Sequence, residues 1–225
     1  MLIDDLKQRV IEAEEMIEPV FWSNRRHFYK RSASIALLLA LPYSKSWAGR
    51  QLEEPLADSV RSAMSAAIAY SAPPVPEFTN PMAREKYILW LSEMGLRLKA
   101  KIRDETERKE FLQTIWYESK RAGLEVSLVL GLVQVESNFR KYAVSVVGAR
   151  GYMQVMPFWT RVIGNSDASV LFHMQANLRF GCVILRHYLD IEKGNLFYAL
   201  GRYNGSRGKS PYPDAVLGAQ RKWEM

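Results

Sequence analysis

The stretch from Glu136 to Pro157, ESNFRKYAVSVVGARGYMQVMP, decides the fold of this chain. It follows an almost entirely apolar run, Val126 to Val135, in which leucine and valine recur at helical spacing. Such a run predicts a buried helix, and Glu136 stands at its end, where the core should meet the surface. The sequence therefore places one carboxylate between an apolar helix and a loop that contains two glycines.

Glu136 is expected to be partly desolvated in this position. Burial against apolar neighbours disfavours the charged form of a carboxyl group and raises its pKa, which keeps an acid protonated for donation to a glycosidic oxygen. The alternative is a solvated glutamate at the end of a helix, because most such carboxylates carry out no chemistry. Glu136 considered alone does not choose between these interpretations.

The residues that follow Glu136 at fixed offsets narrow the choice. They are Ser137, Phe139, Ala143, Ser145, Gly148, Ala149, Gly151, Gln154, Met156 and Pro157. This pattern resembles the soluble lytic transglycosylase (SLT) family, and the resemblance extends to Asn177, Gly181, Ala199-Leu200 and Tyr203-Asn204, over roughly residues 107–225. It implies a mainly α, lysozyme-like fold of the goose type, formed by a helical catalytic domain.

The resemblance also implies an activity, cleavage of the MurNAc-GlcNAc β-1,4 bond of peptidoglycan by a lyase that needs no cofactor. In that family a glutamate is the only catalytic carboxylate, and Glu136 occupies its position. Glu136 would protonate the bridging oxygen and then accept a proton from the C6 hydroxyl of the muramic acid. That hydroxyl would attack C1 and close a 1,6-anhydro ring, whereas the general scheme for glycoside hydrolysis uses two carboxylates.

Five further residues are assigned to the site by the same resemblance. Tyr203 matches the tyrosine whose hydroxyl bonds the catalytic carboxylate, and such a donor would fix the rotamer of the acid and tune its pKa. Packing in the core is the alternative interpretation of Tyr203. The positions that contact substrate in the family are filled by Ser145, Gln154, Met156 and Asn204.

The two glycines of the loop have a physical reason to be glycine. A tight turn at Gly148 and Gly151 needs positive φ or a close approach of the backbone. A phosphate-binding loop is the rival interpretation, but the Gly-Lys-Ser/Thr ending and a preceding β-rich strand are both missing from the sequence.

The chain departs from the usual family pattern at two places. It has Gly-Arg-Tyr-Asn-Gly-Ser at residues 201–206, where many members have Ala-Ala-Tyr-Asn-Ala-Gly, and Tyr152 where leucine is common. Arg202 and Tyr152 could line the groove, stack on sugar rings or contact a stem-peptide carboxylate. These departures bear on subsite preference and leave the catalytic positions unchanged.

The composition limits the classes of partner. With 225 residues and 48% hydrophobic content, the chain can bury a sizeable core. Its formal charge of +7 suits a polyanion such as peptidoglycan with attached acidic polymers, or a nucleic acid. Because the sequence contains no recognisable nucleic-acid-binding motif, we expect no nucleic-acid partner.

Cysteine and histidine point to neither disulfide nor metal chemistry. Cys182 is the single cysteine, so no intrachain disulfide can form, and its apolar neighbours favour a buried small side chain. The histidines, His27, His173 and His187, lack the spacing of a zinc site. We therefore expect no metal.

The first 48 residues resemble an export signal. Arg25 to Lys30, RRHFYK, resembles a twin-arginine motif, and the short apolar run Ser34 to Leu41 and the peptidase-like Ser46-Trp47-Ala48 follow it. Cleavage after Ala48 and a periplasmic location would follow. The apolar run is shorter than the roughly 20 residues that span a bilayer, so we expect no permanent membrane anchor. The alternative is a basic surface patch beside a core helix, and the long amphipathic lead from Met1 to Asn24 supports it.

The rest of the chain divides into an N-terminal helical accessory segment, 49–106, with a proline-rich link at 71–81, and a catalytic domain, 107–225. The prolines of the link cannot continue a helix. Periodicity and capping signals predict helices at 49–70, 83–101, 107–121, 157–163, 175–191 and 195–203. A small β-hairpin is expected within residues 143–152.

Three functions from different classes therefore remain open. The first is a lytic transglycosylase acting on peptidoglycan glycan strands. The second is a goose-type muramidase, which would share the acid but admit water. The third is a non-catalytic peptidoglycan-binding accessory of an envelope-spanning assembly machinery, against which the combination of Glu136, Ser145, Gln154 and Tyr203 argues.

Overall fold

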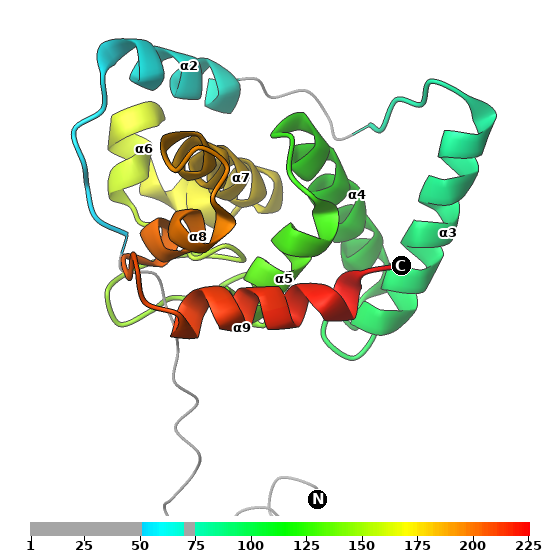
Figure 1. Ribbon diagram of the computed structural model, residues 1–225. Helices are drawn as coiled ribbons and strands as arrows, with labels where there is room; N and C mark the ends of the chain where they lie inside the picture. Colours follow the sequence, from blue (N-terminus) through cyan, green and yellow to red (C-terminus); the bar gives the residue numbers. More distant parts are fainter. Residues whose placement is uncertain (1–50, 70–74) are drawn as a thin grey trace, which may run out of the picture. The chain divides into compact units, whose positions relative to one another are not determined.

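The computed structural model describes residues 51–69 and 75–225, and every regular element within them is a helix (Figure 1). The predicted mainly α fold is confirmed. The predicted signal peptide, residues 1–48, and part of the proline-rich link lie outside the described residues. The helices are α2 (Asp58–Ala69), α3 (Pro81–Leu98), α4 (Glu105–Arg121), α5 (Val126–Ser137), α6 (Phe158–Ile163), η1 (Ala168–Phe172), α7 (Met174–Ile191), α8 (Leu196–Asn204), α9 (Pro211–Gln220) and η2 (Arg221–Trp223).

Helix α5 lies at the centre of the core. Nine of its twelve residues are buried, as expected of a helix that is apolar on every side. It packs along α9, and the two backbones come close at Gly131, where a Cβ would lie 2.7 Å from the backbone nitrogen of Gln220. The helix that carries Glu136 is thus held directly against the C-terminal part of the chain.

Helices α3 and α4 begin at side-chain caps. The Asn80 side chain accepts a hydrogen bond from the Ala83 amide at 2.8 Å, and Asp104 accepts one from the Glu107 amide at 2.7 Å. Each cap satisfies a backbone N–H that has no partner within the helix. These caps start α3 and α4 two residues earlier than the apolar periodicity predicted.

The predicted helix at 49–70 is correct only in its second half. Residues 51–57 are not helical, and α2 begins at Asp58. Pro55 explains the difference, because proline has no backbone N–H and pushes the preceding residue toward an extended conformation. The chain therefore enters α2 through a segment of extended backbone.

The end of α2 is fixed to the body of the domain by two arginines. Arg179 donates to the Ile68 carbonyl oxygen at 3.3 Å, and Arg121 donates to that of Ala67. Both arginines also bond the carboxylate of Glu118, which is 2% exposed, at 3.1 Å. A buried charge is tolerated where it is paired and hydrogen-bonded, and this cluster joins α2 to α4 and α7.

Helix α3 extends the same core. Tyr87, Trp90, Met94 and Leu98 are buried, and the ring of Trp90 lies 4.6 Å from that of Trp116 in α4, measured between centroids. The accessory segment thus contributes to one hydrophobic core with the residues after 107. Within residues 51–69 and 75–225, no helix combines the length and apolar composition that crossing a membrane requires.

Candidate active site

Glu136 lies in the last turn of α5 with 4% of its surface exposed. The helix ends immediately after it, because Asn138 and Phe139 both adopt left-handed backbone conformations, with φ of 50° and 64°. This region is unfavourable for residues other than glycine and stops a right-handed helix. Glu136 is therefore a buried carboxylate, and the interpretation as a solvated helix-end residue is wrong.

Tyr212 provides a hydrogen-bond donor to this carboxylate. Its hydroxyl lies 2.5 Å from the Oε1 atom of Glu136 and donates to it. Burial raises the pKa of Tyr212 well above its usual range, and the negative charge of Glu136 raises it further, so the hydroxyl keeps its proton. Sequence reasoning missed Tyr212, and the only local signal was its place directly after Pro211 in the first turn of α9.

Tyr203 makes a different contact from the one that the resemblance implied. Its hydroxyl donates to the Met153 carbonyl oxygen at 2.8 Å. A phenol has one proton to donate, so the bond expected from Tyr203 to Glu136 comes from Tyr212 instead. Tyr203 is fully buried, and burial followed by the charge of Glu136 raises its pKa well above the usual range. Its part in catalysis stays a prediction.

The loop after α5 is folded by short backbone pairings. It contains two isolated antiparallel bridges, Val144 with Arg150 and Arg150 with Val155, in place of the expected hairpin of regular strands. The Ser145 hydroxyl accepts a hydrogen bond from the Ala149 amide at 3.0 Å, and Gly148 takes a φ of 86° within that turn. The predicted need for glycine at position 148 is confirmed.

Asn177 of α7 fixes the second half of the loop. Its side chain donates to the carbonyl oxygens of Arg150 and Leu171, at 2.9 and 2.8 Å, and accepts from the Met153 amide at 2.9 Å. Gly151 leaves room for it, since a Cβ there would lie 2.3 Å from the Asn177 side-chain nitrogen, and its φ is 74°. The glycine and the asparagine therefore depend on each other.

Met153 packs against Gly181, the glycine of α7. A Cβ on Gly181 would lie 2.2 Å from the sulfur of Met153, so no larger residue fits without a shift. Because the carbonyl of Met153 receives the Tyr203 hydroxyl, Gly181 helps to set the distance between α7, the loop and α8. The motif residues Asn177 and Gly181 thus fix the position of the loop against α7.

The four predicted substrate-binding residues differ in their surroundings. Gln154 is 2% exposed, and its side chain donates to the carbonyl oxygens of Ala143 and Gly151 at 3.1 and 3.0 Å. The Gln154 side chain therefore stabilises the loop by bonding two of its backbone carbonyls. Ser145 and Met156 are partly exposed, and Asn204 is 8% exposed at the end of α8. Contact of these four with substrate stays a prediction.

Tyr152 and Arg202, the two departures from the usual motif, are both engaged within the protein. The first is buried and the second forms ion pairs. Tyr152 is 1% exposed and donates to Glu107 at 3.1 Å, and burial together with that carboxylate raises its pKa. It packs beneath the loop and does not line a groove. Arg202 pairs with Glu192 and with Glu54.

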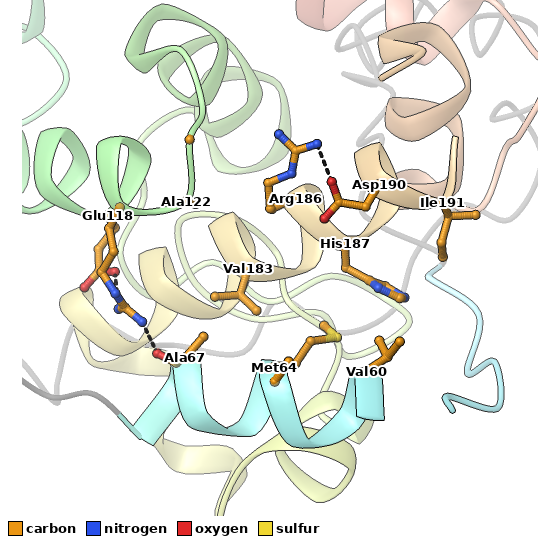
Figure 2. Close-up of a pocket in the computed structure, with 13 residues that line it drawn as sticks. Val60, Met64, Ala67, Glu118, Ala122, Val183, Arg186, His187, Asp190 and Ile191 are labelled. Atoms are coloured by element: carbon orange, nitrogen blue, oxygen red, sulfur yellow. Dashed lines mark hydrogen bonds and ion pairs between the residues drawn. The ribbon is translucent and has the colours of Figure 1, made fainter. Parts of the chain in front are cut away.

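A separate cavity of about 740 Å³ lies between α2, α4 and α7 (Figure 2). Its walls include Val60 and Met64 from α2 and Val183 and His187 from α7. None of the predicted site residues lines it. Among the described residues, no group of three or more His, Cys, Asp or Glu side chains could hold a metal ion.

A family model described as "Transglycosylase SLT domain" matches residues 113–222. This chain carries an SLT domain. Glu136, Tyr203 and Tyr212 all lie within the matched residues, whereas α2 and α3 precede them. The predicted resemblance is confirmed, and the helical architecture is that of a lysozyme-like SLT domain.

Relatives of the SLT domain include enzymes named "Membrane-bound lytic murein transglycosylase C". That of Glaesserella parasuis serovar 5 (strain SH0165) is 45% identical over 53 residues, which are 24% of this chain and 15% of the relative. That of Actinobacillus pleuropneumoniae serotype 5b (strain L20) is 45% identical over 89 residues, 36% of this chain and 24% of the relative. The similar part thus spans about a quarter or less of these relatives.

Proposed function

We propose that this chain is a peptidoglycan lytic transglycosylase, which cleaves the MurNAc-GlcNAc β-1,4 bond and leaves 1,6-anhydroMurNAc ends. The observation that carries the proposal is the buried Glu136, bonded by Tyr212 at 2.5 Å within the SLT domain. The names of the relatives, lytic murein transglycosylases, support it. Glu136 is the catalytic residue of this proposal.

Glu136 acts first as an acid and then as a base. Burial favours its neutral form, which transfers a proton to the bridging oxygen as the bond to C1 breaks. The hydrogen bond from Tyr212 stabilises the carboxylate that remains. This carboxylate takes the proton of the C6 hydroxyl while O6 bonds to C1, which returns Glu136 to its starting form and consumes no water.

The proposed mechanism uses Glu136 as its single carboxylate. After burial, the charge of Glu136 is the next largest cause that raises the pKa of both Tyr203 and Tyr212. Glycosidases that use water or a covalent intermediate place a second carboxyl group within about 5–9.5 Å of the first. Attack by the C6 hydroxyl replaces that second group with an atom of the substrate.

The loop must hold the C6 hydroxyl over C1, since the advantage of an intramolecular attack depends on orientation. We assign this positioning to the partly exposed Ser145 and Met156 and to Asn204 at the end of α8. Gln154 acts through the shape of the loop, because its amide bonds are made to backbone carbonyls. Tyr203 serves the same loop through its bond to Met153.

Action on peptidoglycan places the protein in the cell envelope. We propose export by the twin-arginine route through Arg25 and Arg26, with cleavage after Ala48. Residues 49–106 would then form the accessory segment of the exported protein and residues 107–225 its catalytic domain. An envelope-spanning assembly machinery is the proposed partner beyond the glycan. Replacement of Arg25-Arg26 by Lys-Lys should leave precursor in the cytoplasm, and an unchanged periplasmic yield would contradict this route.

Digestion of purified peptidoglycan tests the activity. The full chain and its Glu136→Gln variant are compared, and the soluble products are weighed by mass spectrometry. We expect the unmodified chain to release muropeptides lighter than hydrolytic products by one water molecule, and the variant to bind glycan without cleaving it. Reducing ends would instead indicate a muramidase, and no product from either protein would indicate a binding accessory.

A further inference from the structure

The non-helical segment before α2 reaches the proposed active site. In Figure 1 it runs beside α6 and α8 before the chain turns into α2. Its first described residue, Gln51, is 4% exposed. The Gln51 side-chain oxygen accepts hydrogen bonds from the indole N–H of Trp159 at 2.9 Å and from the backbone N–H of Met156 at 3.4 Å.

The two donors lie where the loop after α5 leads into α6. Met156 is one of the predicted substrate-binding positions, and Trp159 lies one turn further on in α6. Gln51 also lies near enough to Tyr203 to lower the pKa of that tyrosine, against the larger effect of burial, which raises it. Gln51 therefore occupies space next to Tyr203, on which the charge of Glu136 also acts.

The segment is fastened by ion pairs near the surface. Glu53 pairs with Arg161 at 3.2 Å, and both side chains are more than half exposed. Glu54 receives two hydrogen bonds from one Arg202 nitrogen, at 3.0 and 3.1 Å, with 45% of the Glu54 side chain exposed. Exposed pairs of this kind hold weakly and are screened by salt.

Gln51 itself is incompletely satisfied. Its side-chain nitrogen makes no hydrogen bond of good geometry to any described residue, although it is buried. A buried polar group without a partner costs free energy. A ligand that satisfies the same two N–H donors without burying an unpartnered nitrogen could therefore displace the Gln51 side chain.

The chemistry of the donors indicates which group that is. A carboxamide oxygen accepts two N–H donors here, and the acetamido oxygen of an N-acetylated sugar is the same kind of acceptor. The proposed substrate carries an acetamido group on each sugar. We propose that Gln51–Leu56 is an autoinhibitory strap, whose Gln51 carboxamide occupies a site, formed by Met156 N–H and Trp159 Nε1–H, that binds a substrate acetamido group.

The strap competes with the glycan from within the same chain. Only molecules whose strap is released can bind substrate, so the apparent association constant is the intrinsic one multiplied by the released fraction. A weakly fastened strap makes this fraction sensitive to changes at its anchors. Arg202, one of the departures from the usual motif, serves in this proposal as an anchor of the strap.

Binding of the trimer of N-acetylglucosamine to the full chain, measured by calorimetry, tests the proposal. Glu54→Gln removes one anchor and should tighten binding by about twofold to fivefold, as expected for loss of an exposed ion pair. Gln51→Ala removes the competing carboxamide and should tighten it more, by about tenfold. Glu85→Gln, an exposed acid on α3, makes the same charge change away from the strap and should leave affinity unchanged.

Amide hydrogen exchange provides the second readout. Saturating trimer should raise the exchange of residues 52–57 in the unmodified chain, because the strap leaves its site. Weaker or unchanged binding in both variants, or trimer binding without faster exchange in the strap, overturns the proposal and makes the segment a wall of the groove or a structural brace.

The strap rests on the proposed function, and the two fail in different ways. If the proposed function is wrong, neither the unmodified chain nor the Gln51→Ala variant releases anhydro products from peptidoglycan. If only the strap is wrong, both release those products at equal rates, or the variant does so more slowly.

Discussion

The hydroxyl of Tyr212 donates to the carboxylate of Glu136 at 2.5 Å, across 76 positions of sequence. Tyr212 stands in the first turn of α9 and Glu136 in the last turn of α5, so the contact depends on the packing of these two helices. Gly131 permits their close approach. The geometry of the acid is therefore set by the C-terminal part of the chain as much as by its own motif.

Removing the hydroxyl of Tyr212 should change the pH dependence of cleavage. Tyr212→Phe deletes a hydrogen bond to the charged form of Glu136, which raises the pKa of that carboxyl group. In the proposed mechanism cleavage begins from protonated Glu136, so the decline of the rate on the alkaline side should move to higher pH. The carboxylate left after proton transfer loses its donor at the same time, so we expect a rate at neutral pH lower by about tenfold to a hundredfold, measured as kcat against pH.

Tyr203→Phe is the matched control for that experiment. It removes the same atom from a neighbouring tyrosine whose hydroxyl bonds the Met153 carbonyl. It should lower stability through the loop, by about 1 kcal/mol, and leave the alkaline limb near its original pH. If Tyr203→Phe moves the limb and Tyr212→Phe does not, the assignment of the two tyrosines is reversed.

The contact between Gly181 and Met153 predicts a steric effect. Gly181→Ala places a Cβ 2.2 Å from the Met153 sulfur and should cost about 1–3 kcal/mol of unfolding free energy, with a loss of activity. Gly95→Ala, also inside a helix, meets its nearest atom only at 4.0 Å and should be neutral or stabilising by up to about 1 kcal/mol. Urea titration of both variants checks this, and equal effects would contradict the packing argument.

The bonds of Asn177 predict a second effect on the loop. Asn177→Asp removes two donations, to the carbonyl oxygens of Arg150 and Leu171, and brings a negative charge toward them. A loss of about 2–3 kcal/mol is expected from the buried groups left without partners. Asn165→Asp keeps its role as an acceptor for the Asp167 amide and should change stability by less than about 0.5 kcal/mol in the same urea titration.

Glu192 predicts a dependence of stability on pH. Hydrogen bonds and ion pairs with Arg207 and Arg202, the first the larger, lower the pKa of Glu192 from 4.5 to about 2. A carboxyl group whose pKa is lower in the folded state stabilises the fold above its unfolded pKa, and this contribution disappears as pH falls from about 4.5 to about 2. Glu192→Gln should therefore reduce stability at pH 7 by about 1–2 kcal/mol, allowing for screening by solvent around Arg207.

The measurement for Glu192 is a pair of urea titrations at pH 7 and near pH 2. The difference between the unmodified chain and Glu192→Gln should be present at the first pH and absent at the second. A difference that persists near pH 2 would assign the effect to packing and not to charge.

The local predictions that depended on one short stretch succeeded. The apolar periodicity of residues 126–135 predicted α5, and the glycines at 148 and 151 do adopt positive φ. The expected helix at 49–70 is wrong over residues 51–57, because Pro55 disfavours helical backbone there and α2 begins only at Asp58. Capping residues also moved the starts of α3 and α4, as side-chain caps act on individual backbone groups that periodicity does not describe.

The sequence by itself determined which residue types stand at the site and in what local geometry. A buried helix, an acid at its end and a loop with glycines at its turns all follow from interactions between residues close in the chain. The tertiary structure alone decided which tyrosine bonds Glu136, that Gln154 points its amide into the loop, and that Gln51 lies on Met156 and Trp159. The contacts of Tyr212 and Gln51 join residues far apart in sequence, and the loop around Gln154 takes its path from Asn177 of α7. Which partner is reached depends on how whole helices pack, which no local pattern encodes.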